Sequence, residues 1–167
     1  MANLEERFAA LEQRVRRLED ELEIRDMFVC YGMAADTGDA ARLAAMFTED
    51  GVYDVGDSGG LMEGREAVHG MIMGESHQSR LPNLGHTVGP LALKFEGDKA
   101  VAYGYSRTYL KTGDQVGTWR LAYNRISLER RDGRWQMKRR TNLMVGSEEA
   151  QEIFRDGLKN LPQTGRV

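Results

Sequence analysis

Two residues are best suited to acid–base chemistry, Asp36 and His86. Asp36 closes a mostly apolar segment, and His86 stands between Gly85 and Thr87 at the start of a strand-like run. A carboxylate that holds one imidazole nitrogen in its protonated form leaves the other nitrogen basic. We therefore expect both side chains to meet at the floor of an enclosed cavity, where the charge of Asp36 raises the pKa of His86. The non-catalytic alternatives are that Asp36 only caps the end of its helix, and that His86 is a strand-edge residue hydrogen-bonded to backbone groups.

The segment that carries Asp36 predicts a helix. Its apolar residues fall at three- and four-residue steps, so one side of a helix over residues 24–36 faces a core. A tight turn follows, and Asp39 is a suitable N-cap for a second helix that continues toward Phe47. Asp36 would then lie at the end of the buried side of the first helix.

Ahead of this helix the chain carries a heptad pattern. It spans fewer than three full heptads, which is short for an independent coiled coil. We expect the seam to pack against a neighbouring subunit of a homodimer or homotrimer, or over its own domain. The six apolar positions of the seam are Leu4, Phe8, Leu11, Val15, Leu18 and Leu22.

The rest of the chain predicts a sheet and two further helices. Glycine-containing turn signals separate successive apolar runs, which is typical of strands joined by hairpins. Helices followed by such a meander predict an α+β fold in a single domain over residues 1–167. An amphipathic helix over 1–23 would precede a cone over 24–160, in which a strongly curved, mixed or antiparallel sheet curls over helices. The expected turn is 48–51, the strands are 52–55, 61–64, 91–95, 99–110, 115–130 and 134–145, the helices are 65–73 and 148–160, and the loops are 74–82 and 161–167.

Composition narrows the class of protein. A net charge of −3 gives no general attraction to nucleic acid. No apolar run approaches the roughly 20 residues that cross a membrane, and the charged N-terminal segment is not typical of a signal peptide. The single cysteine, Cys30, is expected in the core, and a chain without a disulfide indicates a reducing, cytoplasmic compartment. His69 and His77 have no Cys or acid at metal-ligand spacing, so no metal site is predicted.

Several loose motifs follow one another in a set order. A charged amphipathic helix precedes a helix with Tyr31 and Asp36, and then come Phe47-Thr48-Glu49-Asp50-Gly51, Glu63-Gly64-Arg65-Glu66-Ala67, the histidine before a strand, and Arg131-Asp132-Gly133-Arg134-Trp135. Over nearly the whole chain, this order resembles the SnoaL-like branch of the NTF2-like superfamily. Within that branch it is similar to bile acid 7α-dehydratase, scytalone dehydratase and hexachlorocyclohexane dehydrochlorinase. The resemblance implies a cone-shaped pocket with an inward Asp–His pair that works without metal or organic cofactor.

The resemblance also assigns residues. Tyr31 and Asp36 match a tyrosine and an aspartate of the bile acid enzyme at the same five-residue separation, and His86 matches its histidine when the following strand is aligned. A neighbouring alignment places Asn83 at that position instead. Thr108 stands where the bile acid enzyme has an acidic residue, which implies a different substrate or mechanism.

Strand alternation supplies further pocket candidates. The resemblance turns the small-residue face of the 99–110 strand inward and leaves its aromatic face to pack against helices or another subunit. Arg140 and Tyr53 match a pocket arginine and a pocket tryptophan of the dehydrochlorinase. For Arg120, Asn124 and Asn142, a position in the pocket and an ordinary surface or cross-strand role are equally open. The predicted catalytic residues are Tyr31, Asp36, His86 and Arg140, and the predicted substrate-binding residues are Tyr53, Thr108, Arg120, Asn124 and Asn142.

A pocket with these hydrogen-bond donors suits an oxygenated aromatic or polycyclic substrate. The leading hypothesis is a cofactor-independent lyase in which His86 is the base, Tyr31 and Tyr53 donate hydrogen bonds to the reacting oxygen, and Arg140 stabilises negative charge. Loss of water and retro-aldol cleavage use the same groups. The alternatives are an isomerase or cyclase with a ketone or polyketide-like substrate, and a non-catalytic small-molecule-binding or assembly module.

Overall fold

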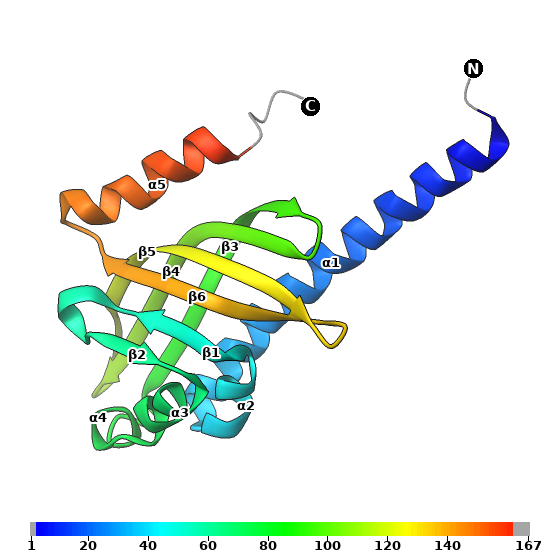
Figure 1. Cartoon of the computed structure of the whole chain (residues 1–167). Coiled ribbons are helices and arrows are strands. Elements are labelled where there is room, and N and C mark those ends of the chain that lie inside the picture. Colours follow the sequence, from blue (N-terminus) through cyan, green and yellow to red (C-terminus); the bar gives the residue numbers. More distant parts are fainter. Residues whose placement is uncertain (1–2, 162–167) are drawn as a thin grey trace.

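The computed structural model describes residues 3–161, which form helices around a curved six-stranded sheet (Figure 1). This architecture confirms the predicted α+β fold. The helices are α1 (Leu4–Thr37), α2 (Ala40–Ala45), α3 (Arg65–Met73), α4 (Glu75–Gln78) and α5 (Glu148–Asn160), with a short 3₁₀ helix over Gly56–Ser58. The strands are β1 (Phe47–Asp54), β2 (Leu61–Glu63), β3 (Leu84–Glu96), β4 (Lys99–Thr112), β5 (Gln115–Arg131) and β6 (Arg134–Met144).

The strand order in the sheet is β2-β1-β6-β5-β4-β3. Strands β3 to β6 form the predicted antiparallel meander, and β1 joins it by pairing parallel to β6. The meander turns at Gly97, Gly113 and Gly133, whose φ angles of 60°, 59° and 77° favour glycine. The sheet is therefore mixed, with one parallel pair among the described strands.

Side-chain alternation gives the sheet two apolar faces. On one face, α1, α2 and α3 join strand residues such as Ala100 and Ala102 in the main cluster. On the other face, Ile153 and Phe154 of α5 pack in a smaller cluster with Tyr103. Figure 1 shows α5 and the C-terminal half of α1 on different sides of the sheet. The aromatic side of β4 therefore packs against a helix, as predicted.

Helix α1 is continuous over 34 residues, so the heptad segment and the predicted helix that follows it are one element. Its N-terminal half extends beyond the sheet (Figure 1), and its C-terminal half is buried through Ile24, Phe28 and Tyr31. The helix ends where Gly38 adopts a left-handed φ of 71°. Asp39 then caps α2, as predicted. No helix within residues 3–161 is both long and apolar enough to cross a membrane.

Three local predictions are wrong. The predicted turn at 48–51 lies within β1, where pairing with β6 is irregular between Phe47 and Val52. The predicted loop at 74–82 contains α4. Cys30 is exposed rather than in the core, because it lies on the side of α1 that faces away from the sheet.

Two other boundaries differ from the prediction. The strand predicted at 91–95 begins earlier, at Leu84, and His86 lies near its start as expected. The predicted tail at 161–167 lies outside the described residues, apart from Leu161.

Candidate active site

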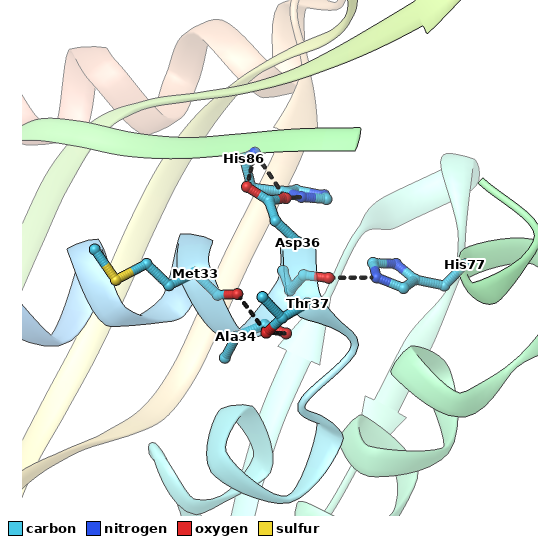
Figure 2. Close-up of polar contacts among 7 residues, drawn as sticks. Met33, Ala34, Asp36, Thr37, His77 and His86 are labelled. Carbon is cyan, nitrogen blue, oxygen red and sulfur yellow. Dashed lines mark hydrogen bonds and ion pairs between the residues drawn. The ribbon is translucent and has the colours of Figure 1, made fainter. Parts of the chain in front are cut away.

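The structure brings Asp36 and His86 into contact (Figure 2). Nδ1 of His86 lies 2.6 Å from Oδ1 of Asp36, and the backbone amide of His86 donates to both carboxylate oxygens at 3.0 Å. In the neutral ring this places the proton on Nδ1, because the carboxylate is an acceptor only. Nε2 is then the basic nitrogen, and His86 lines a cavity.

Two elements position this pair. Asp36 lies in the last turn of α1, where the helix dipole disfavours a carboxylate, so its placement depends on the two donors of His86. The close approach of α1 to β3 depends on Gly32, because a Cβ atom there would lie 2.5 Å from the carbonyl oxygen of His86. Asn83, the other candidate for the histidine position, is exposed and does not line the cavity.

The pair is only part-buried, with 19% of the His86 side chain and 30% of the Asp36 side chain exposed. It therefore lies in the wall of the cavity and not at a sealed floor. The expectation that the pKa of His86 is raised is wrong in its net direction. Burial lowers the pKa most, and nearby His77 and Arg140 lower it further, which together outweigh the effect of Asp36. The ring is thus neutral, and able to accept a proton, at neutral pH.

The cavity has a volume of about 230 Å³. Three of its buried polar side chains are Tyr31, Tyr53 and Arg140, which are 4%, 8% and 2% exposed. The guanidinium carbon of Arg140 lies 4.6 Å from the ring centroid of Tyr31 and 5.0 Å from that of Tyr53, within cation–π range. Burial raises the pKa of Tyr31, and the neighbouring Tyr53 raises it further. Tyr31 therefore stays protonated and can donate a hydrogen bond to a ligand.

Amide side chains hold Arg140 in place. Its Nε donates to Oδ1 of Asn124 at 3.0 Å, and Asn142 donates to the same oxygen at 2.8 Å. Ser106 accepts from both amides, at 2.9 Å from Asn124 and 2.7 Å from Asn142. Asn142 and Ser106 line the cavity, whereas Asn124 is fully buried and does not. Asn124 thus lies where it can orient Arg140 without touching a ligand.

Two other predicted residues reach the cavity from neighbouring strands. Thr108 is buried and pairs with His86 in the β3–β4 ladder, so the two lie at the same level of the cavity. Arg120 projects from β5 and donates to Oγ of Ser58 at 2.7 Å. Seven of the nine predicted site residues line the cavity; Asp36, which contacts His86, and Asn124 do not.

Sequence reasoning missed His77, Arg80 and Trp119, which also line the cavity. Nε2 of His77 lies 2.8 Å from the carbonyl oxygen of Ala35 (Figure 2), and its ring stacks on that of His86 at a centroid distance of 5.8 Å. Arg80 lies over the Trp119 ring at 4.8 Å. No apolar periodicity indicated α4, so the side chains on and after it could not be placed. Among the described residues, no three His, Cys, Asp or Glu side chains are grouped to hold a metal ion.

Comparison with known proteins identifies relatives. The chain matches the SnoaL-like domain over residues 16–141, and no curated protein matches it. It is 33% identical to an NTF2-like protein with a cystatin-like fold from Novosphingobium aromaticivorans, with a TM-score of 0.83 over 92% of this chain and 97% of that chain. A protein of unknown function from Mycobacterium tuberculosis is 20% identical, with a TM-score of 0.70 over 86% of this chain and 89% of that chain. A protein from Catenulispora acidiphila in complex with S-DNPA is 24% identical, with a TM-score of 0.65 over 74% of this chain and 92% of that chain. Because the domain match spans both Asp36 and His86 and the fold is that of these structures, the chain belongs to the SnoaL-like family of the NTF2-like superfamily.

Proposed function

We propose that the chain is a cofactor-independent lyase acting on an oxygenated aromatic or polycyclic small molecule. The observation that carries this proposal is the 2.6 Å contact between Asp36 and Nδ1 of His86 at the wall of a cavity. It fixes which ring nitrogen is basic, and burial keeps that ring neutral at pH 7. A general base needs both conditions before it can take a proton.

The reaction begins with proton transfer from the substrate to Nε2 of His86. In a dehydration, the proton comes from carbon, a carbon–carbon double bond forms, the C–O bond breaks, and the imidazolium returns the proton to the departing hydroxide. In a retro-aldol cleavage, the proton comes from a hydroxyl group, the C–C bond breaks, and the enolate carbon takes the proton back. Both routes build enolate-type charge on a substrate oxygen, which Arg140 and protonated Tyr31 would stabilise, with Tyr53 as a further donor.

An isomerase or cyclase is the second candidate, since Arg140 beside Tyr31 suits any reaction that passes through an enolate. A non-catalytic binding or assembly module is the third. The Asp36–His86 contact favours the enzymes over this module, because binding or assembly alone does not need an imidazole with a fixed basic nitrogen.

Product analysis tests the proposal. The protein is incubated with a panel of β-hydroxy ketones, hydroxy-steroids and lignin-type phenolics, and the products are identified by mass spectrometry. Loss of water or carbon–carbon cleavage supports the lyase, whereas a product of unchanged mass indicates an isomerase or cyclase. His86→Ala should stop the reaction, and the matched control His69→Ala should not, because His69 is exposed on α3 and does not line the cavity.

We also propose that residues 1–167 form one domain, since α1 shares the main cluster with the sheet, and that it pairs with a second copy through α1. The six seam residues are 52–80% exposed. The opposite side of the same helix faces its own domain, where Arg17 lies over Phe95 and Asp20 pairs with Arg130. The domain therefore leaves the seam open to another chain.

The charges beside the seam suit a parallel pair of helices. By the heptad pattern, Arg7 and Arg14 lie on one side of the seam, and Glu12 and Glu19 lie on the other. In a parallel pair each arginine lies opposite a glutamate of the second copy, whereas an antiparallel pair brings like charges together. Leucine at the d positions together with a valine at the central a position favours two strands, so we propose a homodimer and not a homotrimer. The exposed Cys30 supports a cytoplasmic location, where its thiol stays reduced.

A further inference from the structure

The ionisable side chains that line the cavity are all basic or neutral. Among the lining residues there is no aspartate or glutamate within the described part of the chain, although the net charge of the protein is −3. The positive charge is therefore local to the cavity. The arginines that line it are Arg80, Arg107, Arg120 and Arg140.

Arg140 is the most buried of these arginines and is 2% exposed. Its charge faces only neutral groups, the Tyr31 and Tyr53 rings and the Asn124 amide. Nη1 has no hydrogen-bond partner within residues 3–161, and the guanidinium forms no ion pair with any described carboxylate. A buried charge without a counterion is unfavourable, and Nε is already used by Asn124. The end of the guanidinium is thus the part left to meet a ligand.

The other three cavity arginines also have neutral partners. Arg120 donates to Oγ of Ser58, Arg107 donates weakly to the carbonyl oxygen of Gly89 at 3.4 Å, and Arg80 donates to Ser76. Arginines elsewhere do find carboxylates: eight of them form ion pairs in the described chain. A shortage of acidic residues therefore does not explain the unpaired charge of the cavity.

We infer that the ligand of this cavity binds as an anion, with a planar oxyanion conjugated to its ring, a carboxylate or an ionised enol, against the guanidinium of Arg140. A hydrogen bond between a guanidinium and an oxyanion is roughly twice as strong as one between neutral groups. This inference rests on the proposed function only in using the same cavity, because binding does not require turnover. A purely structural Arg140, held by two tyrosine rings, would instead be indifferent to ligand charge.

The experiment compares matched probes by isothermal titration calorimetry at pH 7.5 and low salt. One pair is 2-naphthoate and 2-naphthamide, and the other is 2-hydroxy-1,4-naphthoquinone, ionised at this pH, and its neutral 2-methoxy ether. We expect the anion of at least one pair to bind about 10- to 100-fold more tightly, as a hydrogen bond to a charged group predicts. The pair that discriminates tells whether the oxyanion is a carboxylate or an enolate.

Variants then assign the preference to Arg140. Arg140→Met should abolish the preference for the anion and Arg140→Lys should keep part of it, which separates loss of charge from loss of fold. The matched control is Arg139→Met. Arg139 is the neighbouring residue of β6, but it is exposed and paired with Asp54. His86→Ala should keep the preference, so failure of the lyase proposal is distinguishable from failure of this one. The inference is overturned if neither anion binds more tightly than its neutral partner, or if the preference survives in folded Arg140→Met.

Discussion

Replacing Asp36 with asparagine should reverse the tautomer of His86. In the native pair, Oδ1 accepts from both the ring and the backbone amide of His86, and Oδ2 accepts from the amide at 3.0 Å. Because the backbone amide of His86 lies 3.0 Å from both oxygens, the new amide nitrogen meets that N–H in either orientation. If the oxygen faces the backbone, the amide nitrogen donates to Nδ1, which must lose its proton. We expect this orientation, because an aspartate-to-asparagine change beside a catalytic imidazole gives the reversed tautomer, and it leaves Nε2 protonated and unable to act as a base.

The size of the effect follows from this geometry. Stability should fall by only about 1–2 kcal/mol, because charge-assisted hydrogen bonds become neutral ones in a part-exposed pair. Turnover should fall by about 10²- to 10⁴-fold, because the base is in the wrong tautomer. Long-range ¹H–¹⁵N spectra of the imidazole rings report the tautomer without a substrate. We expect Nδ1–H in the wild type and Nε2–H in Asp36→Asn, with Asp26→Asn on the exposed side of α1 as the control. A wild-type ring already in the Nε2–H form would refute the reasoning.

Three further predictions concern pH, packing and assembly. Because burial lowers the pKa of His86, the rate should fall on acidification only below about pH 6.5, where the base becomes protonated. A fall in rate that begins above that pH would contradict the assignment of His86 as the base. Gly32→Ala should lose about 1–3 kcal/mol in chemical denaturation, since its Cβ would meet the carbonyl oxygen of His86. Gly70→Ala, whose Cβ meets nothing within 4 Å, should lose none. Finally, Leu11→Cys in a Cys30→Ala background should form a symmetric disulfide dimer on oxidation, because a parallel pair places the two copies of position 11 opposite each other. A monomer in sedimentation would rule out the proposed dimer.

Patterns local in sequence predicted the elements well. The turn after Thr37, the cap at Asp39 and the hairpin glycines each depend on a few adjacent residues, and the structure has them in place. Cys30 was misplaced because α1 is apolar on two sides, and periodicity alone does not tell which side meets the sheet. Val29 and Met33 share its outward side and are 57% and 62% exposed.

The lining of the cavity and the protonation of His86 depend on contacts that no local sequence pattern shows. Strand alternation and family resemblance placed most of the wall, but the pKa of His86 was expected with the wrong sign because burial and the nearby Arg140 act only in three dimensions. His77 reaches the site from α4, which has a single turn and no apolar repeat. Asn124 alternates onto the correct face, yet Arg140 lies between it and the ligand space.

The most direct test of the central claim is the rate at which His86 removes a proton from a bound carbon acid. In D₂O, the protein should catalyse deuterium incorporation next to the carbonyl group of a bicyclic ketone such as 2-tetralone, measured by mass spectrometry after subtraction of the uncatalysed rate. We predict that His86→Ala is slower by about 100-fold or more. Equal exchange by the two proteins, or no exchange above background by the wild type, would contradict the account.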